Sequence, residues 1–383
     1  MDLRLTSEQA ALREQAEVLA RELEPLAEAA PESRRQGMPS DGDSREVTAE
    51  LGRAGWIGMT WPVESGGRGL SHVDAALVEN VLGYHWLPLS LYLLSYKTVG
   101  CAIERFGSPE LRERLLPEIA RGGLLFCQGF SEPGAGSDLG ALTTRAILEG
   151  DRFVVSGHKI WTSSAWLADW IYLAVRTDPD RPKHGGISVL VAPIDTLGIE
   201  VRRFPVLGGG YLCEVFLDEV EIPRANLVGE LHEGWNVLMG TLDFERVTAE
   251  KLGSLAWVLD ALEEYLSAID RLDARAWERV ARLRGELGAA RLLSLRAADL
   301  LDRGEPASSA SAMAKLSGAR LAQRLASVAG DLLGLEGLRD GDPEAPLRGR
   351  VAALLRASVG STISGGTTEV QQLVIARRGL GLL

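Results

Sequence analysis

Residues 127–140 carry the densest group of residues that could bind a ligand. The segment reads CQGFSEPGAGSDLG and follows a short apolar stretch. Glycines let backbone N–H groups approach a bound anion, and Ser137 adds a hydroxyl donor. An ordinary Pro-Gly turn has the same composition, so the loop alone does not establish a ligand site. It is not a dinucleotide-binding fingerprint, because no glycine stands three positions after Gly136 and no helical pattern follows.

A second candidate for chemistry is a carboxylate on an apolar helical face. Glu245 follows Leu242 by three residues and Leu238 by seven, so the three share one face of a predicted helix. A carboxylate on a buried face requires a reason. One reason is an ion pair with Arg246 or another arginine of the helical region. The other is general-base catalysis, in which burial raises the pKa of the carboxylate.

The other residue types with catalytic or metal-binding potential form no constellation. The histidines are scattered and give no metal-ligand spacing: His72, His85, His158, His184 and His232. The cysteines are equally far apart and are typical of reduced, buried thiols: Cys101, Cys127 and Cys213. No Ser-His-Asp or Cys-His arrangement is found, and Cys127 is expected to pack rather than to act as a nucleophile. The sequence therefore predicts no metal site.

Composition limits the class of protein. The chain has 383 residues, 25% charged and 46% hydrophobic, which is enough for a large core divided into two or three domains. A formal net charge of −12 argues against nucleic-acid binding, which needs a basic face. The first residues lack the apolar region of a signal peptide, and the longest apolar run contains Pro88 and is too short to span a bilayer. We expect a cytoplasmic protein.

Two kinds of hydrophobic pattern divide the chain into three parts. Helical periodicity covers the first part, where residues 6–9 form a capping box at the start of a helix. Short β-rich segments separated by Gly and Pro turns follow, at 152–157, 170–176, 186–192, 200–203 and 214–222. Helical periodicity returns at 234–269, 272–303, 307–338 and 345–359.

These patterns predict a multidomain α+β architecture. An N-terminal helical domain is expected over 1–118 and an antiparallel β-barrel or sandwich over 119–230. A C-terminal four-helix bundle, which carries Glu245, is expected over 231–383.

Three ordered motifs on this plan resemble the acyl-CoA dehydrogenases, and the similarity covers essentially the whole chain. They are SEPGAGSD at 131–138, GHKIWTS at 157–163 and GGTTEVQ at 365–371. The resemblance implies FAD as cofactor, an acyl-CoA thioester as substrate, and an electron-transfer flavoprotein or similar acceptor. It implies a flavin between the β domain and the helical bundle.

The resemblance assigns roles to individual residues. Trp161 is expected to pack against the flavin ring and Ser163 to hydrogen-bond it, which suits a flat conjugated ring. The other residues expected at the cofactor are Gln128, Phe130, Ser131, Gly136, Ser137, Thr367 and Glu369. Those expected at the substrate are Ser137, Leu242 and Arg246.

The sequence departs from the family pattern at the catalytic base. In much of the family a glutamate directly precedes the glycine of the C-terminal signature, and here that position is Gly365. A variant of the family carries the base on the first long helix after the β domain, which makes Glu245 the candidate here. The backbone N–H of Gly365 is expected to polarise the thioester carbonyl.

A second departure concerns the neighbouring subunit. Homomeric members carry an Arg-x-x-Phe-Gly element in a loop between bundle helices, and residues 265–275 lack it. Residues 331–337 read DLLGLEG, with an aspartate that would repel a pyrophosphate. The chain thus resembles one subunit of the heteromeric (α2β2) actinobacterial enzymes that act on steroid side-chain thioesters.

That resemblance leaves several alternatives open. One is a homo-oligomer with a modified FAD site, and another is a non-catalytic or FAD-poor partner subunit. A third is a dehydrogenase of an acyl group bound to a carrier protein. An acyl-CoA oxidase is disfavoured, since those chains are much longer.

Overall fold

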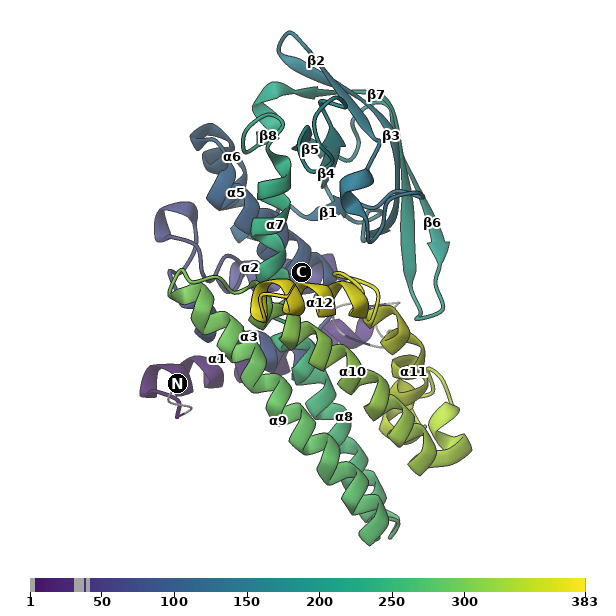
Figure 1. Cartoon of the computed structure of the whole chain (residues 1–383). Coiled ribbons are helices and arrows are strands. Elements are labelled where there is room, and N and C mark those ends of the chain that lie inside the picture. The colour runs from purple at the N-terminus through teal and green to yellow at the C-terminus, as the bar shows by residue number, and fades with distance from the viewer. Residues whose placement is uncertain (1–3, 31–37, 39–41, 383) are drawn as a thin grey trace.

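The computed structural model describes residues 4–30, 38 and 42–382. Helices, then strands, then helices again follow one another along the chain, so the predicted α+β architecture is confirmed. Figure 1 shows the strands at one end of the molecule and the long C-terminal helices at the other.

The N-terminal helices pack around a shared apolar core. They are α1 (Ser7–Ala29), α2 (Arg45–Arg53), η3 (Val63–Ser65), α3 (His72–Tyr84), α4 (Ser90–Leu93), the π-helical η4 (Leu94–Gly100), α5 (Cys101–Phe106) and α6 (Pro109–Ala120). The predicted capping box is confirmed, because Thr6 accepts from Gln9 N and Gln9 accepts from Thr6 N, both at 3.2 Å. The two reciprocal bonds satisfy backbone donors that a helix start leaves free.

The middle of the chain forms one sheet. Its strands are β1 (Phe126–Gly129), β2 (Arg145–Glu149), β3 (Arg152–Ser163), β4 (Trp170–Arg176), β5 (Ile187–Pro193), β6 (Ile199–Pro205), β7 (Tyr211–Pro223) and β8 (Leu227–Val228). Their order is β6-β7-β3-β2-β4-β5-β8, and β1 pairs with β4. Most pairs are antiparallel as predicted, but β1 and β2 both run parallel to β4. Two short 3-10 helices, η5 (Leu139–Ala141) and η6 (Arg224–Asn226), join the strands.

Strands β4 and β5 lie between two hydrophobic cores. Tyr172 and Val189 pack in the core of the N-terminal helices, whereas Leu173 and Leu190 pack in the core of the β domain. Both faces of these strands are therefore buried, which explains why they read as continuous apolar runs rather than as alternating ones. This packing joins the sheet to the N-terminal helices.

The C-terminal part is a bundle with a short final helix. Its elements are α7 (Gly234–Glu245), α8 (Ala249–Ala268), α9 (Ala274–Asp302), α10 (Ser308–Leu333), η7 (Gly334–Leu338), η8 (Pro346–Gly349), α11 (Arg350–Ser361), α12 (Thr368–Val374) and the π-helical η9 (Ile375–Gly379). The prediction of one helix over 234–269 is wrong, because α7 and α8 are separate helices. Their junction follows Glu245.

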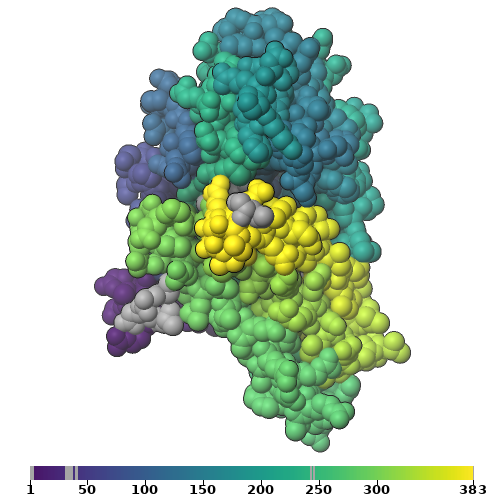
Figure 2. Space-filling model, in the orientation of Figure 1, coloured from purple at the N-terminus to yellow at the C-terminus, as the bar shows by residue number. Residues whose placement is uncertain are grey.

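The sheet and the bundle contact each other at more than one place. The turn between β6 and β7 reaches α11, where Arg356 Nε donates to the Leu207 carbonyl at 3.0 Å. Figure 1 shows α12 at the junction of the sheet and the bundle, and Figure 2 shows the C-terminal residues on the surface between them. The C-terminal signature therefore lies where the two parts of the molecule face each other.

Candidate functional site

The residues expected along the flavin edge extend from the end of β1. Gln128 is half-buried and pairs with Tyr172 of β4 in the sheet. Phe130 is buried against the ring of Tyr172, with centroids 5.4 Å apart. Ser131 is half-buried, and its carbonyl accepts from Ile160 N at 2.9 Å. The first motif is thus bonded directly to the strand that carries the second.

A buried ion pair strengthens this connection. Lys159 Nζ lies 2.8 Å from Glu132 Oε1 and also donates to the carbonyl of Phe130 at 3.1 Å. The Glu132 carboxylate accepts from the backbone N–H groups of Thr143 and Thr144 at 2.7 and 2.8 Å. Although burial raises the pKa of Glu132, Lys159 and these donors outweigh it and lower that pKa to about 2. The glutamate stays charged and holds the loop.

Trp161 stands on β3 at a bulge. The register between β3 and β7 shifts between Lys159 and Thr162, and Trp161 has a φ of 62°. A positive φ is an outlier for a bulky residue, and a bulge re-aims the side chain. The indole is 56% exposed, and its edge contacts Phe204 with centroids 5.4 Å apart. Ser163 follows on the same strand and is half-buried.

The glycine-rich loop leaves open space beside its backbone. Gly136 and Ser137 are exposed, and a Cβ added at Gly136 would meet no atom within 4 Å. The far end of the loop is fixed, because Arg176 Nη2 donates to the Gly140 carbonyl at 2.7 Å. A Cβ at Gly140 would lie 2.8 Å from the ring of His184, so a larger residue there would require that ring to shift. The loop is anchored at both ends and open at its centre.

The C-terminal signature turns through two left-handed glycines. Gly365 has a φ of 63° and Gly366 a φ of 93°, conformations that favour glycine. Buried Gln371 donates from Nε2 to the carbonyl of Gly365 at 2.9 Å. Lys315 of α10 donates to the carbonyl of Gly366 at 2.5 Å. Fixing these carbonyls also fixes the peptide planes next to them.

Thr367 and Glu369 belong to the start of α12. Thr367 Oγ1 accepts from Val370 N at 3.2 Å and caps the helix. Glu369 is exposed, and hydrogen bonds from its own backbone N–H and from Thr367 lower its pKa. These contacts serve the helix start, and a role of the two residues at the cofactor stays a prediction.

The candidate base lies where α7 ends. Helix α7 packs against β5 and η4, and Glu245 is its last residue. The side chains of Leu242 and Glu245 lie outside the part of the chain that the structure describes, so their roles stay predictions. Arg246, the next residue, is buried.

The arrangement fits a flavin. An exposed indole held by a bulge gives a flat ring an apolar face, and the open glycine-rich loop gives a polar chain access to backbone N–H groups. Among the described residues no group of three or more His, Cys, Asp and Glu side chains could hold a metal ion. No helix in the described ranges is long and apolar enough to cross a membrane.

Sequence reasoning missed the lysines that hold the motifs in place. Lys159 is an even number of residues from Phe153 and Val155, which are buried. Since every second residue of a strand points to the same face, this spacing could have indicated that the lysine is buried. Its partner Glu132 is in the first motif, but nothing local links the two residues. Lys315 gave no local signal, because its acceptor is far along the chain.

Three family domains match almost the whole chain. They are the acyl-CoA dehydrogenase N-terminal domain over residues 6–123, the middle domain over 127–220 and the C-terminal domain over 232–380. The chain therefore belongs to the acyl-CoA dehydrogenase family. It is a flavin-dependent oxidoreductase, and its cofactor is FAD.

Particular relatives are similar over nearly the full length. Acyl-CoA dehydrogenase FadE26 of Mycobacterium tuberculosis is 35% identical over 353 residues, which cover 88% of each chain. The structure titled Tcur3481-Tcur3483 steroid ACAD has a TM-score of 0.90 and 32% identity, covering 100% of both chains. The ChsE4-ChsE5 complex from Mycobacterium tuberculosis has a TM-score of 0.88 and 32% identity, also covering 100% of both.

Proposed function

We propose that this chain is the base-carrying subunit of a heteromeric acyl-CoA dehydrogenase that oxidises a bulky or branched, steroid-side-chain-like acyl-CoA. The proposal depends on which residues are found at two positions of the chain. Gly365 occupies the place where much of the family has its glutamate, and Glu245 ends α7 where a variant of the family has its base. The similarity to a steroid ACAD and to a two-chain complex supports the substrate class and the heteromer.

Different residues of the chain have different roles at the thioester. Glu245 takes the proton from the carbon next to the thioester carbonyl. The backbone N–H of Gly365 donates to that carbonyl and stabilises the negative charge that develops on its oxygen. When bound, FAD would supply the acceptor for the hydride that leaves the next carbon. Trp161 and Ser163 hold the flavin, and Leu242, Arg246 and Ser137 contact the substrate.

A cleft beside the glycine-rich loop supports CoA, rather than a carrier protein, as the thiol component of the substrate thioester. It has a volume of about 330 Å³ and is lined by Leu142, Thr143, Arg145, Arg176, Pro179, Arg181 and Lys183. Four of these residues are cations, and carboxylates partly offset them, since Lys183 pairs with Asp138 at 2.6 Å. Arginine and lysine suit phosphate groups, which CoA carries. A carrier protein is the alternative, and comparing acyl-CoA with the matching acyl-carrier substrate separates them.

Two regions support a partner that completes the FAD site. Residues 265–275, which span the end of α8, the connecting loop and the start of α9, lack the arginine element of homomeric relatives. Asp331 on α10 forms an ion pair with Arg279 of the same chain, at 2.7 Å. This position therefore carries a negatively charged side chain that already has a partner within its own chain. Both features leave the chain poorly equipped to bind the pyrophosphate of a neighbour's FAD.

Co-expression with a homologous chain tests the proposal. The chain alone and the mixed complex are purified, and FAD content and substrate-dependent bleaching of the flavin are measured with straight, branched and steroid-side-chain acyl-CoA thioesters. Bleaching is expected only in the mixed complex, and fastest with the bulky thioesters. Glu245→Gln should keep FAD but abolish bleaching.

Several results would contradict it. Undiminished bleaching in Glu245→Gln excludes this base. Complexes that stay colourless favour a non-catalytic subunit, and a yellow, active homo-oligomer excludes the heteromer.

A further inference from the structure

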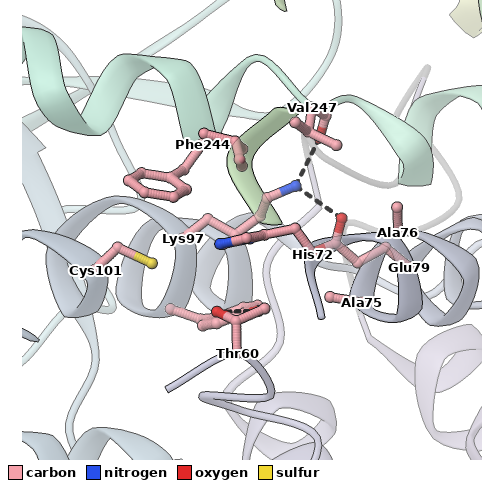
Figure 3. A pocket seen from close by; sticks show the side chains of 11 residues that line it. Thr60, His72, Ala75, Ala76, Glu79, Lys97, Cys101, Phe244 and Val247 are labelled. Atoms are coloured by element: carbon pink, nitrogen blue, oxygen red, sulfur yellow. Dashed lines mark hydrogen bonds and ion pairs between the residues drawn. The ribbon is translucent and has the colours of Figure 1, made fainter. Parts of the chain in front are cut away.

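A small cavity lies beside the chain that follows the candidate base. Its volume is about 20 Å³, and it lies between α3, η4 and the α7–α8 junction. Phe244 and Val247 line it, so the segment containing Glu245 borders this space (Figure 3). Two charged residues, Glu79 and Lys97, also line the cavity although both are buried.

Lys97 links three parts of the chain. Its Nζ lies 2.7 Å from Glu79 Oε2 on α3 and donates to the Val247 carbonyl at 2.6 Å (Figure 3). The lysine itself is in η4, whose wider π-helical turn is a feature often found at functional sites. A buried ammonium needs such partners, because leaving it unpaired is costly.

The Val247 carbonyl lies inside an unexpected helix break. Residues 246–248 separate α7 from α8 and contain neither glycine nor proline, and Thr248 makes no side-chain cap. The first bond of α8 runs from Leu252 N to Thr248 O at 3.3 Å. The carbonyl one residue earlier accepts from Lys97 instead. β-Branched residues lower helix propensity only slightly, so the local sequence does not account for the break.

The start of α8 is also fixed against α3. A Cβ at Gly253 would lie 2.0 Å from the Asn80 carbonyl, and a Cβ at Gly83 would lie 1.9 Å from the Glu250 carbonyl. The two backbones therefore touch through paired glycines. Asn80 Nδ2 adds a hydrogen bond to the Ala249 carbonyl at 2.9 Å. Because these contacts hold the start of α8 against α3, we expect a change at the break to alter the end of α7 rather than the start of α8.

We propose that Lys97 is a positioning residue for Glu245: it binds the Val247 carbonyl, imposes the break between α7 and α8, and so fixes the main chain at the end of α7 that carries the base. The inference rests on the proposed role of Glu245. Lys97 does not touch the reacting atoms. It acts through the main chain two residues after the base, and Glu79 holds its ammonium in place.

Lys97→Met tests the proposal in the FAD-loaded complex. The methionine fills the space of the lysine side chain but cannot donate a hydrogen bond to the Val247 carbonyl. We expect that carbonyl to accept from the backbone N–H of Lys251 instead, which would join α7 and α8 into one continuous helix. We expect kcat to fall about 100-fold, KM for the acyl-CoA to change less than about threefold, and FAD content to stay the same. Amide hydrogen exchange in residues 246–252 should slow at least about tenfold. Lys251→Met, at the start of α8, is the matched control and should change neither kcat nor the rate of amide exchange in residues 246–252.

Results that would contradict the proposal can be separated from a failure of the proposed base. A folded, FAD-loaded Lys97→Met enzyme with normal kcat, or with unchanged exchange at 246–252, overturns the proposal. If Lys97→Met does not fold, Glu79→Gln weakens the hold on the lysine and should lower kcat about tenfold at constant KM, and normal kcat in this variant overturns it too. Glu245→Gln is measured in parallel. If that variant keeps its activity, the base is wrong, and the exchange data still decide whether Lys97 imposes the break.

Discussion

At the scale of single residues, the site depends on buried charges that join distant segments. Glu132 and Lys159 connect the glycine-rich loop to β3 just before Trp161. Both side chains are almost completely buried, so neither charge can be solvated by water if its partner is removed. Such a pair is weak evidence for added stability, and its effect in the folded chain is to join the glycine-rich loop to β3.

Replacing Glu132 by Gln should destabilise the protein by about 3 kcal/mol near pH 7, because Lys159 is left buried and unpaired. The pKa of Glu132 in the folded chain is about 2, below the ordinary value of 4.5. Its contribution is therefore present above about pH 4.5 and is lost as the pH falls toward about 2. Urea denaturation of wild type and variant between about pH 7 and pH 3.5 measures this. A difference that stays constant over that range contradicts the prediction, and exposed Glu149→Gln is the control.

Gly365 allows a test of the proposed N–H donor. Gly365→Pro removes the N–H, and its ring cannot adopt the φ of 63° found there, so turnover should fall at least about 100-fold. Gly365→Ala keeps the N–H and costs about 1–3 kcal/mol of backbone strain. The alanine variant should retain most turnover once folded. Steady-state kinetics at equal FAD content measures both, and near-normal turnover in the proline variant would remove Gly365 from the mechanism.

At the scale of elements, close contacts between backbones set the positions of the helices. Helices α3 and α8 touch through Gly83 and Gly253, which brings the N-terminal helices against the bundle next to the base. Glycine inside a helix lowers its stability. Its presence at both contact points is therefore explained by packing.

Gly253→Ala should destabilise the protein by about 3 kcal/mol, because its methyl group would lie 2.0 Å from the Asn80 carbonyl. Gly288→Ala on α9 is the matched control, since a Cβ there would meet nothing within 4 Å. The control should stabilise by about 0.5–1 kcal/mol through helix propensity. Thermal unfolding of both variants measures the contrast. Equal shifts in the two would show that the α3–α8 contact is not tight.

At the scale of the whole molecule, the junction of sheet and bundle is where the three family motifs are expected to act together. The C-terminal segment lies on the surface between the two parts (Figure 2).

The proposed heteromer predicts a stoichiometry. If only one kind of interface binds cofactor, the complex should contain two copies of each chain and two FAD molecules. Native mass spectrometry of the co-expressed complex measures the mass and the cofactor count. Four FAD molecules per four chains would mean that both kinds of interface bind the cofactor, which would contradict the interpretation of residues 331–337.

Local sequence patterns were sufficient to predict the fold class, the family and the cofactor. Periodicity and caps are local, so the α+β plan and the capping box at Thr6 could be predicted. The motifs at 131–138, 157–163 and 365–371 are contiguous, and they identified the family before any contact was known.

The way those segments are held depends on contacts between residues that are remote in sequence. The break after Glu245 was predicted as continuous helix, because the group bound to the Val247 carbonyl is Lys97, 150 residues earlier. The partnership of Glu132 with Lys159 and the contact of Lys315 with Gly366 likewise join segments that are remote in sequence. Patterns report which face of an element is buried, whereas the partner of a buried charge depends on packing between elements.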